Sequence, residues 1–114
     1  DNIKTDSGSE FKGNVKKFDI NKLNEKPKIP HLGWNSIKVV KDNNLFNGID
    51  QNYGFYFIHS YYFQCLNSDD KLTTTFYGDE FTSSVNSANI YGTQFHPEKS
   101  HFNGVKILEN FAKI

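Results

Sequence analysis

Cysteine and methionine are nearly missing from this chain, and the shortage narrows the kind of protein it can be. Its 114 residues include no Met and a single Cys, Cys65. One Cys cannot form an internal disulfide, which excludes the disulfide framework of small secreted domains. A lone thiol is typical of a reducing compartment, so we expect a cytoplasmic location. Because even position 1 is not Met, we expect either a processed start or a piece of a longer chain.

The chain also lacks an excess of charge of either sign. It has no Arg, and its 13 Lys balance 13 acidic residues, so the formal net charge is zero. Nucleic-acid binding depends on clustered basic residues that neutralise phosphates, so we expect no nucleic-acid partner. No apolar run reaches the roughly 18 residues of a membrane-spanning helix, and we expect no membrane partner.

Apolar side chains are nevertheless plentiful. They make up 36% of the chain and include 11 Phe and 6 Tyr, enough for a packed core in one domain or part of one. Runs of β-branched and aromatic residues bounded by turn residues predict strands. These runs cover residues 15–18, 36–40, 55–63, 71–77, 81–85 and 89–95. The turn signal at Gly78 predicts a hairpin between the runs on either side of it, while residues 1–13 and 43–54 are predicted to be loops.

One helix is predicted, over residues 101–113, with Ser100 as its cap. Two prolines three residues apart exclude a regular helix over residues 21–28. Within the predicted helix, apolar residues recur every three to four positions and form one stripe of an amphipathic helix. The stripe consists of Phe102, Val105, Leu108 and Phe111 or Ala112.

The balance of strands and helices is uneven. The run at 55–63 is almost continuously apolar, which is typical of a strand covered on both faces. One amphipathic helix cannot cover both sides of a sheet. Either a second sheet packs against this strand or the missing helices lie outside the chain, and we favour the second explanation.

His96, Pro97 and Glu98 carry the sharpest chemical signal. They stand between a predicted strand and the predicted helix, where Pro97 stiffens the turn by fixing φ. Imidazole works as a base near neutral pH, and a carboxylate on its far nitrogen fixes its tautomer. A solvated surface turn is the competing interpretation. His96 and His101 have no third clustered ligand for zinc, so we expect no metal and no cofactor.

Three motifs, in order along the chain, resemble the class I (triad-type) glutamine amidotransferases. Phe-His-Pro-Glu at 95–98, after Tyr-Gly-Thr-Gln, resembles the His/Glu end of that family. Pro-His-Leu-Gly-Trp-Asn at 30–35 and Phe-Ile-His-Ser-Tyr-Tyr at 57–62 are similar to one branch, the glutaminase subunits of imidazole glycerol phosphate synthase. The tail at 104–111 matches the last helix of that branch. The resemblance runs from about residue 8 to the end.

The resemblance implies a reaction and residues that carry it. In this family a cysteine thiolate attacks the side-chain amide of glutamine, and ammonia leaves as an acyl-enzyme thioester forms. His96 maps onto the general base and acid, and Glu98 maps onto the carboxylate that orients it. Ser60 and Tyr61 map onto a segment that lies along the bound glutamine.

The resemblance also implies a partner, a cyclase/synthase (β/α)₈ barrel that receives the ammonia in histidine biosynthesis. Trp34, Asn35 and Lys99 map onto the region that faces this barrel in a heterodimer. Leu32 stands where the branch has Met, which is a conservative departure. Two alternatives remain open: a paralogue that feeds ammonia to a sugar- or surface-polysaccharide-modifying synthetase, and a non-catalytic module that docks on a barrel.

The nucleophile of the family is missing from the sequence. The family carries it in a Gly-x-Cys-x-Gly elbow upstream of the Pro-His-x-Gly-Trp-Asn segment, and small neighbours relieve strain at that sharp turn. Cys65 has no glycine on either side and follows the His-Ser-Tyr strand, so we expect an incidental thiol. We therefore expect residues 1–114 to be the C-terminal portion of one amidotransferase domain, inactive alone. The implied fold is α/β, with a flavodoxin-like open mixed sheet.

Three further aromatic residues have expected structural roles. His31, beside a proline and a glycine, is expected to shape a turn or an interface. His59 lies within an aromatic strand, where a hydrogen-bonded core histidine is the default. Trp34 is most simply a core residue, whereas an exposed Trp would point to an interface.

Overall fold

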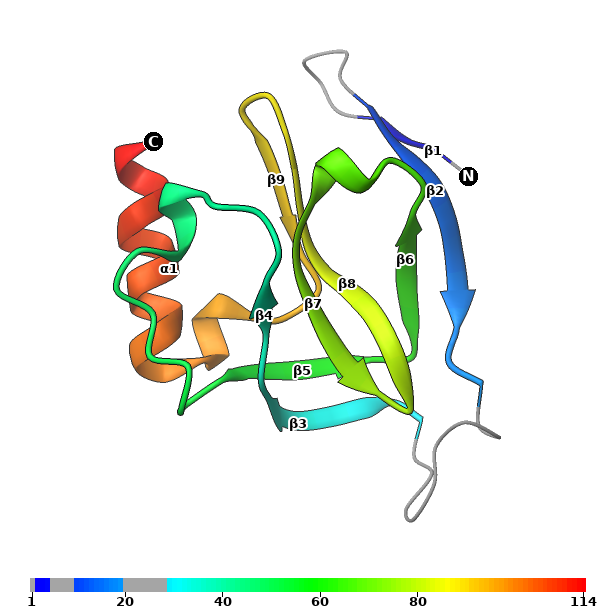
Figure 1. Ribbon diagram of the computed structural model, residues 1–114. Helices are drawn as coiled ribbons and strands as arrows, with labels where there is room; N and C mark the ends of the chain where they lie inside the picture. The colour runs from blue at the N-terminus through cyan, green and yellow to red at the C-terminus, as the bar shows by residue number, and fades with distance from the viewer. Residues whose placement is uncertain (1, 5–9, 20–28) are drawn as a thin grey trace.

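The computed structural model of the chain describes residues 2–4, 10–19 and 29–114. The predicted segment at 21–28 lies outside these residues. Short 3₁₀ turns occur at Asn44–Phe46, Ser68–Asp70 and Pro97–Lys99. The regular elements, shown in Figure 1, are β1 (Asn2–Lys4), β2 (Glu10–Lys17), β3 (His31–Asn35), β4 (Lys38–Val39), β5 (Phe55–His59), β6 (Tyr61–Cys65), β7 (Lys71–Tyr77), β8 (Asp79–Ser87), β9 (Ile90–Thr93) and α1 (His101–Lys113).

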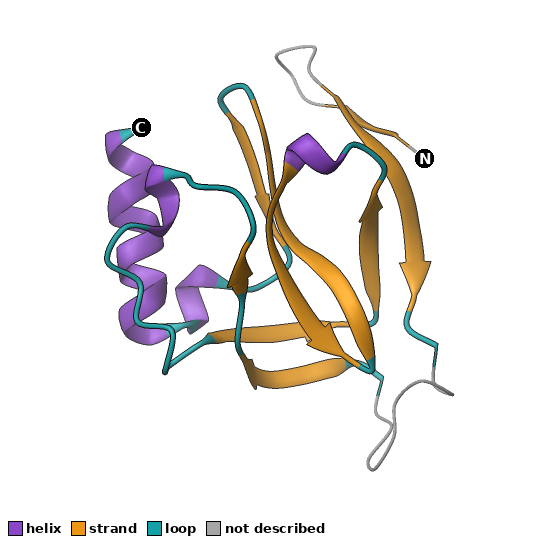
Figure 2. Ribbon diagram, viewed as in Figure 1, coloured by secondary structure: helices purple, strands orange, loops and turns teal. Residues whose placement is uncertain are grey.

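The strands form three small sheets. Their orders are β1-β2-β6, β3-β5 and β4-β7-β8-β9. Every strand pair among the described residues is antiparallel, so the open mixed sheet stays a prediction for a larger domain. Figure 2 shows α1 on one side of the four-stranded sheet and the β2–β6 pair on the other. The expectation of a loop over residues 1–13 is wrong where β1 pairs with β2, because its polar residues suggested no strand.

The hairpin predicted around Gly78 is confirmed. Gly78 has φ of +75°, a conformation that an L side chain rarely adopts, and it lets β7 turn directly into β8. Tyr77 lies opposite Asp79 at the end of the ladder. The predicted strand at 89–95 is also confirmed, as the shorter β9.

The run at 55–63 does not form one strand. It breaks at Ser60, so that β5 pairs with β3 while β6 pairs with β2 in a different sheet. In β5, Phe55 and Phe57 are buried while Ile58 is exposed, so this strand is covered mainly on one face. The expectation of a strand buried on both faces is therefore wrong here, since continuous aromatic content concealed an alternating burial pattern.

The core lies where the sheets meet, and aromatic rings fill it. Phe18 packs edge-on against Phe81, with ring centroids 5.3 Å apart. Phe55 and Phe95 lie 4.2 Å apart between their ring centroids. The buried core is completed by Ile37, Leu45, Phe46, Phe57, Leu72 and Ile107.

The bounds predicted for the helix are confirmed, but its apolar stripe faces outward. Ile107 is 3% exposed, whereas the predicted stripe residues are each about half exposed: Phe102 51%, Val105 56%, Leu108 53% and Phe111 52%. Asparagines explain the rotation of the helix. Asn103 donates to the carbonyls of Asp50 and Gly54 and accepts from the Asp50 amide, and Asn110 donates to two carbonyls of the turn at 45–47.

The helix therefore attaches to the rest of the chain through Asn103, Ile107 and Asn110, which recur every three to four residues on one face. The buried amides have all their donors and acceptors used, so their burial costs little. Counting apolar residues alone could not find this face. In the described parts of the chain, no helix is long and apolar enough to cross a lipid bilayer.

Candidate active site

The site begins where the chain leaves β9 and turns into α1. The His96 amide donates to the carbonyl of Tyr56 in β5 at 2.9 Å, which fixes this turn to the edge of the β3–β5 sheet. Pro97 opens a single 3₁₀ turn, where its missing N–H is no loss. The His96 carbonyl accepts from the Lys99 amide at 3.0 Å and closes that turn. The sequence-predicted pair is thus held between a strand and a helix.

His96 and Glu98 meet through their side chains. His96 Nδ1 lies 3.0 Å from Glu98 Oε2, and the hydrogen bond from His96 lowers the pKa of the Glu98 carboxyl. A carboxylate on Nδ1 keeps the proton there and leaves the lone pair of Nε2 free for a proton from a substrate or nucleophile. Both side chains reach the surface, so they are accessible to a reactant. The pair has the geometry of an oriented general base.

Ser100 and Gly104 build the turn beneath this pair, and sequence reasoning missed both roles. Ser100 stands at the cap position of α1, but its hydroxyl makes no cap hydrogen bond. Its Oγ donates to the His96 carbonyl at 2.6 Å and accepts from the Tyr56 amide at 3.0 Å. A Cβ on Gly104 would lie 1.8 Å from the Pro97 carbonyl oxygen, so only glycine allows the helix to approach the turn.

Ser60 and Tyr61, predicted to lie along glutamine, sit at the break between β5 and β6. The Ser60 carbonyl accepts from the Phe18 amide at 3.2 Å, and Tyr61 is 53% exposed. Both follow β5, the strand to which His96 is fixed through Tyr56. The structure therefore puts the predicted substrate segment and the predicted base on connected parts of one strand. Their roles stay predictions.

The expectation that Trp34 belongs to the core is wrong. Its side chain is 47% exposed and contacts the rings of Tyr56 and His101 edge-on, at 6.0 and 5.4 Å between centroids. Because Trp34 occupies an outward position on the edge strand β3, its ring lines a hollow of about 610 Å³ together with Tyr53 and Phe102. The alternative interpretation, an interface residue, fits this exposure.

The other two residues predicted to face a partner differ from each other. Lys99 is exposed at the surface of the 3₁₀ turn. The amide group of Asn35 instead turns inward, where Nδ2 lies 3.3 Å from His31 Nε2 and donates to the Phe76 carbonyl at 2.9 Å. Asn35 thus has an internal use that its position in the motif did not reveal.

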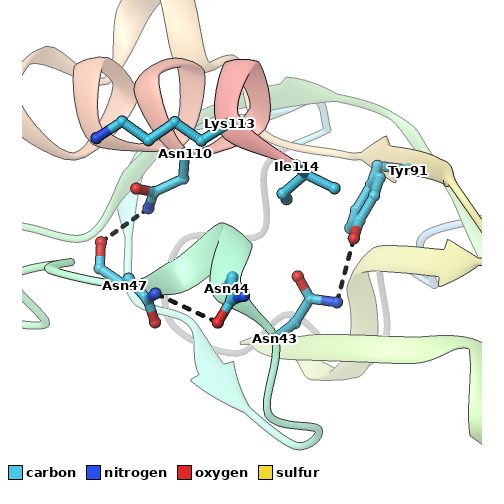
Figure 3. Close-up of a pocket in the computed structure, with 7 residues that line it drawn as sticks. All are labelled: Asn43, Asn44, Asn47, Tyr91, Asn110, Lys113 and Ile114. Atoms are coloured by element: carbon cyan, nitrogen blue, oxygen red, sulfur yellow. Dashed lines mark hydrogen bonds between the residues drawn. The ribbon is translucent and has the colours of Figure 1, made fainter.

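Cys65 lies at the far end of β6, buried, with its Sγ donating to the Asn67 carbonyl at 3.1 Å. Burial raises the pKa of its thiol, which is the opposite of what a nucleophile needs. No cluster of three or more metal-ligating side chains occurs within the described ranges. A separate hollow of about 340 Å³ lies between the turn at 44–46 and the end of α1, lined by Asn44, Asn47 and Asn110 among others (Figure 3).

Comparison with known proteins gives this geometry a family. A family profile described as "Glutamine amidotransferase class-I" matches residues 8–114. The chain therefore belongs to the class-I glutamine amidotransferase family.

Within the family, the similar curated relatives are subunits of one enzyme. The chain is 47% identical over 104 residues to "Imidazole glycerol phosphate synthase subunit HisH" of Leptospira borgpetersenii, covering 91% of this chain and 51% of the relative. It is 52% identical over 103 residues to the subunit of that name from Sulfurimonas denitrificans, covering 90% and 49%. With the subunit from Methanocaldococcus jannaschii, identity is 50% over 107 residues, covering 91% and 50%. The chain thus spans about half the length of the curated relatives it matches.

Proposed function

We propose that the full-length protein is a glutamine amidotransferase subunit that hydrolyses glutamine to glutamate and ammonia. The observation that carries the proposal is the His96–Glu98 pair, 3.0 Å apart and fixed to β5, in a chain that belongs to the class-I family. The name shared by the similar relatives supports imidazole glycerol phosphate formation in histidine biosynthesis as the pathway.

The chemistry assigns a step to each residue. His96 Nε2 takes the proton of a cysteine thiol, and the thiolate attacks the side-chain amide carbon of glutamine. His96 then gives that proton to the departing nitrogen, so ammonia leaves and a thioester remains. A water molecule, deprotonated by the same imidazole, cleaves the thioester to glutamate and restores the thiol. Glu98 holds the imidazole in the tautomer that these transfers need, and Ser60 and Tyr61 bind the glutamine.

The cysteine in this scheme is supplied from outside the 114 residues. A buried thiol of raised pKa makes Cys65 unsuited to the role. The relatives, about twice as long, have room for a further part of the domain that carries a nucleophile. We propose that this chain is the C-terminal portion of one domain whose complete sheet is open, mixed and flavodoxin-like.

The proposed partner is a cyclase/synthase (β/α)₈ barrel that takes up the ammonia in a heterodimer. The exposed ring of Trp34 and the exposed Lys99 support a contact there, because an exposed Trp beside an apolar hollow is typical of interfaces. Asn35, whose amide is used internally, would take part mainly by shaping β3.

Sequencing of the region upstream of Asp1 and a glutaminase assay of the full-length protein test the proposal. We expect a Cys between glycines upstream, and His96→Ala should lower kcat by at least about 100-fold, the size of a general-base contribution. Glu98→Gln should lower kcat as well, while the matched control Glu109→Gln, exposed and paired with Lys106 on α1, should not. Full activity of His96→Ala would exclude it as the base, and an upstream region without a Cys would favour the docking module.

A further inference from the structure

Two histidines outside the His96–Glu98 pair face each other in the core. His31 is 3% exposed and lies between the rings of Phe57 and Tyr77, stacked at 4.8 and 3.9 Å between centroids. His59 lies directly opposite it on β5 in the antiparallel register. Their side chains meet, with His31 Nδ1 3.0 Å from His59 Nε2. Neither ring has a part in the glutaminase chemistry proposed above.

The direction of every hydrogen bond in this group can be worked out from one end. His59 Nδ1 lies 2.8 Å from the Tyr61 carbonyl oxygen, which can only accept, so Nδ1 carries the proton. In a neutral imidazole the other nitrogen then accepts, so His31 Nδ1 donates to His59 Nε2. His31 Nε2 is left as an acceptor, and the Asn35 amide donates to it at 3.3 Å.

The opposite end independently requires the same direction. The Ser36 amide donates to Asn35 Oδ1 at 2.8 Å, which turns Asn35 Nδ2 toward His31. The second hydrogen of Nδ2 goes to the Phe76 carbonyl at 2.9 Å, so the amide cannot flip without losing both contacts. Hydrogen bonds therefore run in one sense from Asn35 through His31 and His59 to the Tyr61 carbonyl. We name this series the histidine relay.

Burial keeps the relay in its neutral form. It lowers the pKa of His31 to about 4, with the neighbouring His59 as a smaller cause, and it also lowers the pKa of His59. The charge of His96 lowers the pKa of His59 further, which places the relay electrostatically within reach of the proposed base. At neutral pH each ring therefore has one donor and one acceptor, as the relay requires.

The relay ends on the segment proposed to bind glutamine. Tyr61 follows Ser60, and the Ser60 carbonyl is held by the Phe18 amide at 3.2 Å. With the Tyr61 carbonyl held by His59, two consecutive carbonyls at the β5–β6 break have fixed partners. A backbone pinned at both positions presents the Ser60 and Tyr61 side chains in one geometry, which lowers the entropy lost on binding.

From this geometry we infer that His31 and His59 are positioning residues, which fix the glutamine-binding break through the Tyr61 carbonyl. The inference rests on the proposed glutaminase function. Its chemical content is a hydrogen-bonded tautomer pair, so it can be tested by moving single donors.

Two substitutions at His59 separate its two hydrogen bonds. Asn places an N–H near the position of Nδ1 and keeps the donor to the Tyr61 carbonyl, whereas Gln places its amide near Nε2 and loses that donor. In the full-length protein with its barrel partner, we expect His59→Gln to raise the KM for glutamine at least about fivefold, the effect of one lost hydrogen bond. We expect His59→Asn to stay within about twofold of the wild-type KM, and kcat to change less than KM in both variants.

A matched control removes a buried hydrogen bond elsewhere. Thr73 Oγ1 lies 2.8 Å from Ser83 Oγ inside the β7–β8 ladder, so Thr73→Val should lower the melting temperature and leave the KM unchanged. Equal KM values for His59→Gln and His59→Asn would overturn the positioning role, as would a rise in KM for Thr73→Val as large as that for His59→Gln.

The tautomers can be observed directly in the wild-type protein, without any variant. We expect ¹⁵N histidine spectra of the full-length protein at neutral pH to show the Nδ1–H form for both His31 and His59. An Nε2–H form at either residue would overturn the relay. A wild-type protein without glutaminase activity would instead overturn the proposed function and the substrate side of the inference, even if the tautomers are as expected.

Discussion

At the scale of single residues, His31 shows how an aromatic environment changes the chemistry of an imidazole. The ring is enclosed by Phe57 and Tyr77, and its pKa falls from the ordinary value of 6.5 to about 4. The motif at 30–35 indicated a turn or an interface at this position, and only the pairing of β3 with β5 shows that the ring enters the core.

The lowered pKa of His31 predicts how stability depends on pH. Between pH 6.5 and about 4 the unfolded chain binds a proton at His31 that the folded chain does not, so the free energy of unfolding falls as pH falls. With about 1.4 kcal/mol for each pKa unit, this residue alone should cost the fold up to about 3 kcal/mol over that window. Chemical denaturation of the full-length protein at several pH values measures the effect.

The variant His31→Asn provides the comparison, because it cannot take up the proton. The difference in unfolding free energy between wild type and variant should shrink as pH is lowered toward 4 and stay constant above about 7. Parallel curves for the two proteins across the whole range would contradict the assigned pKa.

At the scale of elements, α1 shows both the strength and the limit of reasoning from sequence. Its bounds followed from the apolar spacing, since any amphipathic helix has that period. Its orientation did not, because Asn103 and Asn110 bind loop carbonyls far away in sequence. The predicted run at 55–63 was divided for a similar reason: its two halves pair with strands that only the tertiary structure brings near.

Two neighbouring residues of α1 test which face carries the packing. Ile107 is 3% exposed and Leu108 is 53% exposed. Ile107→Ala should lower the unfolding free energy by about 2–5 kcal/mol, because it leaves a cavity in the core. In the isolated chain, Leu108→Ala should change it by less than about 0.5 kcal/mol. Urea denaturation of both variants decides the matter, and a larger loss at Leu108 would show that the helix is rotated.

Gly104 offers a second prediction for this element, where two effects oppose each other. Ala is favoured over Gly inside a helix by about 1 kcal/mol. The new Cβ, however, would meet the Pro97 carbonyl at 1.8 Å, and backbone cannot rotate away as a side chain can. Gly104→Ala should therefore be destabilising, by about 1–3 kcal/mol, and should lower glutaminase kcat by displacing the His96–Glu98 turn.

The matched control for that substitution is Gly92→Ala in β9. Its added Cβ would lie 3.2 Å from one methyl group of Val85, a side chain that can shift slightly. Its melting temperature should stay close to that of the wild type, and its activity should be unchanged. If Gly104→Ala behaves in the same way, the close approach of α1 to the turn is not needed.

At the scale of the whole molecule, the candidate site divides into a part that the sequence could predict and a part that it could not. His96 and Glu98 were predictable because they lie two residues apart and their contact is local. Ser100 was not, since its hydroxyl joins the His96 carbonyl to the amide of Tyr56, 44 residues away along the chain. The inward use of Asn35 and the exposure of Trp34 likewise depend on which face of β3 meets the core.

The asparagine contacts of α1 have a consequence for how the molecule opens. Asn103 and Asn110 tie the helix to the backbone of the loop at 43–54 at both ends of that loop. Neither the loop nor the helix can leave without breaking the same bonds, so the two should detach together as one cooperative unit. In hydrogen exchange, the Asp50 amide should be protected as long as the amides of α1 and lose that protection in Asn103→Ala. Rapid exchange at Asp50 in the wild type would show that the loop moves alone.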